Sequence, residues 1–215
     1  MHIRRHGLSC FALFASALTL SGCIQGQTVE KTYYIVEATR ASGPAAASDA
    51  TLRVRRLNVD DAYATRQMVY RLDEFRYESD YYHQFLILPG VMLTDETRDW
   101  LADSGLFARV SSVGSRYETT YALEGNVIGL YADFTNRLAP QAVVAIRFFL
   151  LTGPEAEATV ALSETYKAAS PIAARTAEAI VAALSKSLAE ILTRLEADLQ
   201  KVLAARPERA TRPGP

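Results

Sequence analysis

Cys23 is the residue of this sequence with the clearest chemical signal. It directly follows Leu20, Ser21 and Gly22, at the end of a head of 22 residues that differs from the rest of the chain. Small side chains before the cysteine let the backbone enter a narrow peptidase site, and the thiol of Cys23 can accept a diacylglycerol. These features suggest that Cys23 is a lipidation site. The alternative interpretation is that Cys23 is an ordinary buried cysteine in a cytosolic or membrane-anchored protein.

The head itself is built like a targeting segment. It begins with Arg4 and Arg5 and no acidic residue, and thirteen apolar and small residues follow at 8–20. A basic start, a short apolar run and small residues before a cleavage point are typical of a secretory signal. Because the end of the head looks like the bacterial lipobox, we predict a lipoprotein signal peptide at 1–22 and lipidation of Cys23. Cys10 would be removed, which leaves no second cysteine for a disulfide.

The residues after Cys23 predict a tethered protein. Residues 23–32 are expected to form a lipidated polar tether, and acyl chains at Cys23 are sufficient for stable anchoring. No later segment reaches about 18 uninterrupted apolar residues, the length of a membrane-spanning helix. Ile24 and Gln25 follow the cysteine, with no Asp at the second position. By resemblance to the sorting rule of enteric bacteria, this predicts anchoring at the periplasmic face of the outer membrane.

Composition narrows the function of the remaining 193 residues. This length is enough for one domain with its own core. Loss of the two head arginines from 23 basic and 24 acidic residues leaves a net charge of −3, which argues against nucleic acid as a partner. His83 is the only histidine left. The last ten residues, 206–215, contain three prolines and predict a disordered tail.

Other chemistry-bearing residues form no recognisable catalytic or metal motif. His83 lies near Asp80 and the pair could do acid–base work, but no nucleophile stands out, so a hydrogen-bonded or surface histidine is the favoured interpretation. The acidic pairs at 60–61 and 73–74 fall at expected turns and have no third ligand nearby. We therefore predict no catalytic residue, no metal site, no cofactor and no enzymatic activity.

Residues 63–85 contain a larger share of aromatic side chains than the chain as a whole. Seven of the 23 residues from Tyr63 to Phe85 are aromatic, compared with 9% of the whole chain, and three arginines lie among them. Tyrosine and arginine are favoured at interface hot spots. The alternative is that these side chains pack on the core of a sheet and rim it. We predict the following partner-binding residues: Tyr70, Arg71, Tyr77, Tyr81, Tyr82 and Phe85.

The pattern along the chain predicts the elements that would position these side chains. Strands are expected at 33–38 and, after a loop at 39–50, at 51–60 with a bulge near Leu57. A hairpin over 65–80 turns near Asp73. Pro89 and Gly90 break the chain, apolar residues then recur at helical spacing from Val91 up to Gly105, and a short strand follows at 106–113. Three longer strands, at 116–134, 141–153 and 157–168, predict an antiparallel meander, in which Gly125 and Gly129 fit a bulge or close packing.

The last expected element is a long helix. Ser170 is predicted as its N-cap and Pro171 as its first residue, with an end near Ala205. Its apolar stripe fits packing on the sheet of the same chain, and the alternative is a coiled-coil seam with another subunit. Together the elements predict an α+β fold for residues 33–205: a single domain with an antiparallel-rich mixed sheet and two helices packed over it.

The order of these elements resembles a known family. Residues 66–110 are similar to the ABC-type transport auxiliary lipoproteins, which include paraquat-inducible protein C. The phrase "QMVYR" at 67–71 matches a family strand, an aromatic strand follows, and a proline-containing helix entry leads to the phrase from Leu101 to Val110. The chain departs from the family near Phe85 or Leu86, where a tryptophan is usual.

The resemblance implies a binding function. Family members accompany MCE-domain proteins in envelope phospholipid transport, so we expect an MCE-domain partner, and formation of a homo-oligomer is compatible with this role. The alternative is a lipoprotein regulator or assembly factor of another envelope machine, in peptidoglycan synthesis or lipopolysaccharide export. An envelope hydrolase would need a catalytic cluster, which the sequence does not show.

Overall fold

The structure of the protein is a computed structural model that describes residues 30–41, 43, 48–111, 118–153 and 157–205. Cys23, the predicted signal peptide and the predicted tail at 206–215 lie outside the described residues. From Lys31 onward the chain forms a single unit, and the following description concerns that unit.

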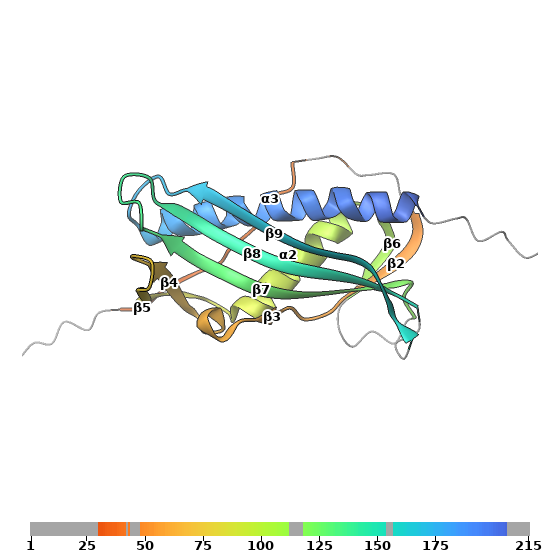
Figure 1. Cartoon of the computed structure of the whole chain (residues 1–215), viewed down its shortest axis with the longest axis horizontal. Helices are drawn as coiled ribbons and strands as arrows, with labels where there is room; N and C mark the ends of the chain where they lie inside the picture. Colours follow the sequence, from red (N-terminus) through yellow and green to blue (C-terminus); the bar gives the residue numbers. More distant parts are fainter. Residues whose placement is uncertain (1–29, 42, 44–47, 112–117, 154–156, 206–215) are drawn as a thin grey trace, which may run out of the picture. The chain divides into compact units, whose positions relative to one another are not determined.

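Three long strands form the antiparallel meander that the sequence predicts (Figure 1). They are β7 (Tyr121–Asp133), β8 (Gln141–Thr152) and β9 (Thr159–Pro171), and β8 pairs with the other two along its whole length. Apolar residues alternate along β7, and every second side chain is buried in its first half. The register slips by one residue between Val127 and Gly129, which confirms the expected bulge.

The other edge of β7 receives three short strands in succession. These are β2 (Ser48–Val54), β3 (Asn58–Val59) and β4 (Gln67–Arg71), and each runs parallel to β7. Strand β6 (Phe107–Ser111) pairs with β2, β5 (Tyr77–Phe85) with β4, and β1 (Thr32–Tyr34) with β5. Over the residues that the structure describes, the result is a mixed sheet of nine strands, in which the long ladders are antiparallel and the short ones mostly parallel. This confirms the predicted antiparallel-rich mixed sheet of an α+β fold.

The N-terminal strand is shorter than predicted. Strand β1 ends at Tyr34, although the apolar pattern continues to residue 38. Beyond it, backbone N–H groups bond to helix side chains instead of a neighbouring strand: Val36 donates to Met92 Sδ at 3.4 Å, and Ala38 donates to Glu96 Oε2 at 2.7 Å. The prediction of a strand over 33–38 is therefore wrong beyond Tyr34, because these N–H groups find acceptors on the helices.

The predicted strand at 51–60 is divided in two. Strand β2 begins earlier, at Ser48, so the expected loop at 39–50 is shorter, and the phase slip near Leu57 is a break between β2 and β3. At the break the N–H of Leu57 donates to Thr94 Oγ1 at 2.9 Å, and this hydroxyl donates to the Gly90 carbonyl. A short 3-10 turn, η1 (Asp61–Tyr63), precedes β4.

Helix α2 (Pro89–Asp103) lies where the sequence predicts it. Pro89 occupies the first turn, where its missing N–H costs nothing, and Gly105 follows the helix with φ of 69°, a conformation that suits glycine. Helix α2 packs against β2, β3 and β6. Strand β6 follows it directly, as the sequence predicts.

Helix α3 (Ala177–Ala204) begins later than predicted. Ser170 and Pro171 belong to β9, where they pair with Ala142 and Gln141, so they do not start the helix. Thr176 is the N-cap instead, and its side chain accepts a hydrogen bond from the Ala179 N–H at 3.3 Å. Strand pairing with β8 outweighs the local capping signal of Ser-Pro.

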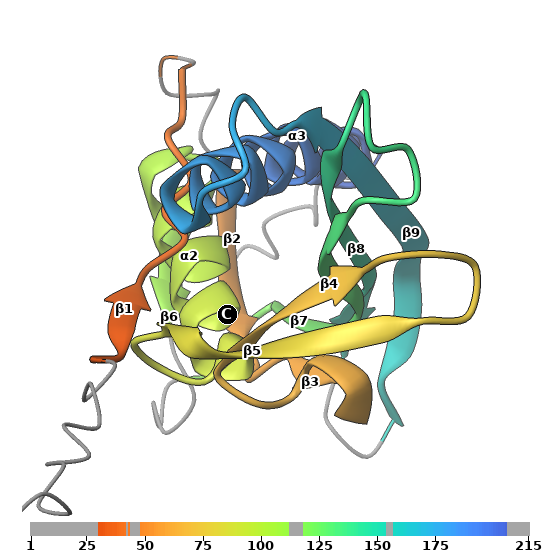
Figure 2. The same cartoon turned by 90° about the vertical axis from the view of Figure 1, so that its left-hand side faces the viewer.

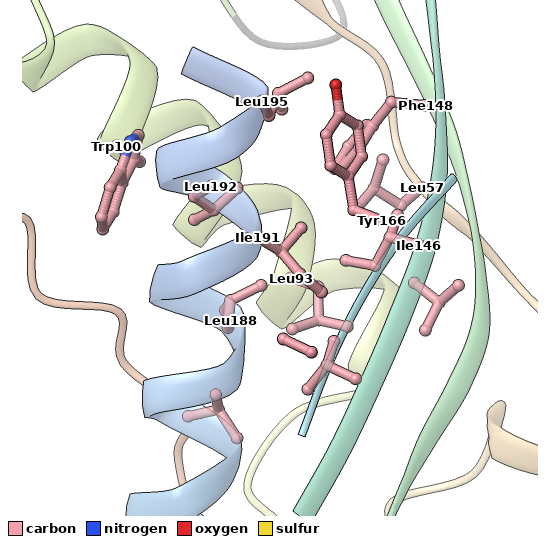
Figure 3. Close-up of a cluster of buried hydrophobic side chains, with 14 of the residues drawn as sticks. Leu57, Leu93, Trp100, Ile146, Phe148, Tyr166, Leu188, Ile191, Leu192 and Leu195 are labelled. Carbon is pink, nitrogen blue, oxygen red and sulfur yellow. The ribbon is translucent and has the colours of Figure 1, made fainter. Parts of the chain in front are cut away.

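The apolar stripe of α3 packs on its own sheet, against β8 and β9. Figure 3 shows Leu188, Ile191 and Leu195 of α3 opposite Ile146 and Phe148 of β8. Helix α2 contributes Leu93 and Trp100 to the same core, and all of these side chains are buried. This confirms the interpretation of the stripe as a core face.

Candidate partner-binding surface

The β4–β5 hairpin carries the predicted partner-binding residues. Its turn falls where the sequence predicts it, between Arg71 and Tyr77, which are paired across the two strands. Asp73 closes the turn, because its Oδ1 accepts hydrogen bonds from the N–H groups of Phe75 at 3.0 Å and Arg76 at 2.9 Å. Figure 2 views the domain from the end where this hairpin lies, with β1 beside the last residues of β5.

The strand pairing of the hairpin contains a wide bulge. Met68 pairs with Asp80, but the preceding residue of β4, Gln67, pairs with Gln84. Three residues of β5, at 81–83, therefore have no partner on β4. Asp80 closes this bulge: its Oδ1 accepts from the N–H of Tyr82 at 2.8 Å and of His83 at 3.0 Å.

The second oxygen of Asp80 is also occupied. The Tyr70 hydroxyl donates to Asp80 Oδ2 at 2.7 Å, and His83 Nδ1 lies 2.8 Å from the same oxygen. Partial burial opposes ionisation, but the hydrogen bonds from Tyr70, His83 and Tyr82 outweigh it and lower the pKa of Asp80 to about 2. Burial, together with the bond to Asp80, raises the pKa of Tyr70. The His83–Asp80 pair is thus a hydrogen-bonded support of the bulge.

The bulge places two tyrosines on the surface. Tyr81 is 57% exposed, Tyr82 is also exposed, and their rings meet edge to face with centroids 5.3 Å apart. Tyr77 is exposed near the turn and contacts the ring of Tyr131, at 6.0 Å between centroids. Phe75, in the turn, is 86% exposed. We did not predict Phe75 as a contact residue, although it belongs to the aromatic stretch and the predicted turn could have indicated its exposure.

The other three predicted residues lie deeper. Phe85 is only 2% exposed and belongs to the core. Tyr70 is half-buried, with its ring edge to face with Phe134 at 5.9 Å. Arg71 is half-buried as well and forms an ion pair with Asp133 at 3.5 Å. The structure therefore brings Tyr81 and Tyr82 together on the surface and exposes Tyr77 separately, near the turn. Tyr70 bonds to Asp80, Arg71 lies 5.9 Å from the centroid of the Tyr77 ring, and Phe85 packs inside.

Within the described residues, no group of three or more histidine, cysteine, aspartate or glutamate side chains could hold a metal ion. In that same part of the chain, no helix is long and apolar enough to cross a membrane. The hairpin exposes aromatic rings and phenol hydroxyls, with the Arg71 guanidinium 5.9 Å from the centroid of the Tyr77 ring.

A mixed sheet with two helices over it and an aromatic hairpin at one end describes a small α+β domain. Residues 33–196 match the family of ABC-type transport auxiliary lipoprotein components. The chain belongs to this family, and the resemblance stated from residues 66–110 is confirmed. No curated protein matches the chain.

Solved structures share the fold. Protein XCC0632 from Xanthomonas campestris, assigned to the DUF330 family model, is 19% identical with a TM-score of 0.68, covering 80% of this chain and 96% of that one. The hypothetical protein CT253 from Chlamydia trachomatis is 7% identical with a TM-score of 0.53, covering 74% of this chain and all of its own. At these identities the likeness shows the fold alone.

Proposed function

We propose that this protein is an outer-membrane-anchored periplasmic lipoprotein that binds the MCE-domain protein of an ABC-type lipid transporter. Its membership in a family of transport auxiliary components supports a transporter as the partner. The observation that carries the binding role is the bulge closed by Asp80, on which Tyr81 and Tyr82 are exposed. Large aromatic side chains fixed before binding lose little conformational entropy on complex formation.

The hairpin surface comprises Tyr77, Tyr81 and Tyr82, with Phe75 at the turn. These side chains are all exposed and lie along one strand and its turn. In this proposal the partner contacts the hairpin surface, and no catalytic step is involved. The acyl chains on Cys23 keep the domain at the membrane while the partner arrives from the periplasm.

The anchor is tested with Cys23→Ser. We expect unprocessed precursor to accumulate, because the thiol that accepts the diacylglycerol is gone. Gel mobility and metabolic labelling with a radioactive fatty acid measure this, and Ser21→Ala, which keeps a small residue before the cleavage point, is the control. A Cys23→Ser protein with normal mobility and acylation would refute the anchor.

The partner is tested by crosslinking full-length protein in its native membranes, followed by affinity purification and mass spectrometry. We expect an MCE-domain protein, and we expect Tyr81→Ala with Tyr82→Ala to reduce its recovery at least about tenfold, because hot-spot aromatics contribute about 2 kcal/mol each. Val160→Ala, on exposed β9, is the control. Unchanged recovery with unchanged thermal melting would refute the hairpin surface. Recovery of peptidoglycan or lipopolysaccharide machinery instead would replace the proposed function.

A further inference from the structure

A second apolar surface lies beside β1, at the other end of β5 from the hairpin turn. Three consecutive residues between β5 and α2 are exposed: Leu86 at 47%, Ile87 at 38% and Leu88 at 45%. Tyr33 of β1 is 45% exposed as well. Single exposed apolar side chains are ordinary, but a run of three next to an exposed tyrosine marks an interaction site.

Hydrogen bonds and a cation–ring contact connect β1 with the segment that follows β5. The N–H of Leu86 donates to the Tyr34 carbonyl at 2.8 Å, which places residue 86 directly beside β1. Arg66 connects Leu86 with Tyr33 of β1. Its Nη1 donates to the Leu86 carbonyl at 3.1 Å, and its guanidinium lies 5.7 Å from the centroid of the Tyr33 ring. Lys31 lies next to β1, with its Nζ 4.0 Å from the centroid of the Tyr81 ring.

We propose that Tyr33, Leu86, Ile87 and Leu88 form a membrane-contact patch that lies on the bilayer holding the Cys23 lipid. This inference rests on the proposed function only through the lipid anchor. We choose the bilayer as the surface that covers this patch because only a short chain connects the lipid to the domain. Cys23 precedes Lys31 by eight residues, so Lys31, the residue before β1, can be at most about 28 Å from the lipid even if that chain is fully extended.

The side chains of the patch suit the headgroup region of a bilayer. Leucine and isoleucine enter the boundary of the acyl chains, and tyrosine is favoured at the interface because its ring is apolar and its hydroxyl polar. Lys31 and Arg66, at the margin of the patch, can bond to lipid phosphates while their aliphatic stems lie along apolar surface. Tyr81 borders the patch, because Lys31 Nζ contacts its ring, and the rest of the hairpin surface extends from there along β5 toward the turn, away from the patch.

The test is a depth measurement on the lipidated protein. The mature chain has no cysteine besides Cys23, so Ile87→Cys offers a single site for an environment-sensitive dye. Labelled protein, purified from membranes with its lipid, is placed in vesicles of phosphatidylethanolamine and phosphatidylglycerol that contain nitroxide-bearing lipids. We expect the dye at position 87 to be quenched by these lipids.

Val160→Cys is the matched control. Val160 is exposed on β9, which the sheet separates from β5 by β8, β7 and β4. At the usual spacing between neighbouring strands, these four steps along the sheet correspond to about 19 Å. We expect no quenching of a dye at position 160.

The outcomes separate the patch from the anchor. Vesicle flotation without quenching at position 87 would overturn the patch and leave the anchor intact. Failure of the protein to float would overturn the anchor, and the patch with it. Adding Leu86→Ser and Leu88→Ser should abolish quenching at position 87 while thermal melting stays unchanged, and persistent quenching would show that these side chains do not hold the face to the bilayer.

Discussion

Asp80 shows how one carboxylate shapes the surface of this domain. Its two oxygens take part in four hydrogen-bond contacts, with two backbone N–H groups of the bulge, the Tyr70 hydroxyl and the His83 ring. A carboxylate is well suited to this position because it accepts at both oxygens and donates nothing. The bulge that carries the exposed Tyr81 and Tyr82 is therefore held in place by the carboxylate of Asp80.

We expect Asp80→Asn to destabilise the protein by about 1–3 kcal/mol. One amide oxygen cannot replace both carboxylate oxygens, so the half-buried Tyr70 hydroxyl or the bulge N–H groups lose an acceptor. Denaturant unfolding measures the effect. Glu78→Gln, at an exposed position of the same strand, is the control and should change stability little.

The same carboxylate predicts a pH dependence. Its folded pKa, about 2, lies below the unfolded value, so it stabilises the fold above about pH 4 and this contribution is lost as the pH falls from about 4 to 2. Stability measured over that window should fall more steeply for the parent protein than for Asp80→Asn. Equal slopes would show that protonation of Asp80 does not cause the loss of stability at acid pH.

At the scale of elements, β7 determines how the sheet is assembled. One edge is paired continuously with β8, and the other edge receives β2, β3 and β4 one after another. Gly125 of β7 lies beside the break between β2 and β3, because β2 pairs with β7 as far as Leu123 and β3 pairs with it from Asn126. A Cβ there would be 2.8 Å from Leu57 Cδ2 and 3.0 Å from Phe148 Cδ1, so the site requires glycine for close packing, as the sequence suggests.

We expect Gly125→Ala to lower the free energy of unfolding by about 1–3 kcal/mol, the usual cost of overpacking a core. Thermal or denaturant unfolding measures it. Gly43→Ala is the matched control, because no atom lies within 4 Å of its added Cβ. A Gly125→Ala protein as stable as the parent would mean that Leu57 and Phe148 move apart without cost.

At the scale of the whole domain, Glu196 links three parts of the chain. From α3 it accepts hydrogen bonds from Arg40 at 2.7 and 2.9 Å and from the Trp100 indole N–H of α2 at 2.9 Å. The bond to Arg40 and the bond to Trp100 outweigh desolvation and lower the pKa of Glu196. The segment that follows β1 is thereby fixed across both helices.

We expect Glu196→Gln to destabilise the domain by about 3 kcal/mol, because a largely buried guanidinium loses its carboxylate. Glu190→Gln on the same helix is the control: its pair with Arg194 spans 3.7 Å between exposed side chains, and such pairs contribute little. Chemical denaturation compares the two variants. Equal effects would contradict the assignment of Glu196 as the link between the helices and the N-terminal segment.

The sequence alone determined what depends on local pattern. The antiparallel meander, the helix after Pro89 and the turn at Asp73 were predicted correctly, because turn residues between strands, a helix-starting proline and turn side chains act over a few residues. The family was also predicted from the order of elements at 66–110. Lipidation of Cys23 and binding by the tyrosines stay predictions.

Only the tertiary structure decided what depends on distant partners. The end of β1 at Tyr34 and the extension of β9 through Pro171 follow from acceptors and strands far away in the sequence. Which aromatics are exposed was also decided this way: Phe85 packs inside, whereas Tyr81 and Tyr82 are turned outward by a bulge whose register requires both β4 and Asp80. Pairing register and burial are properties of the assembled sheet, so a local pattern cannot specify them.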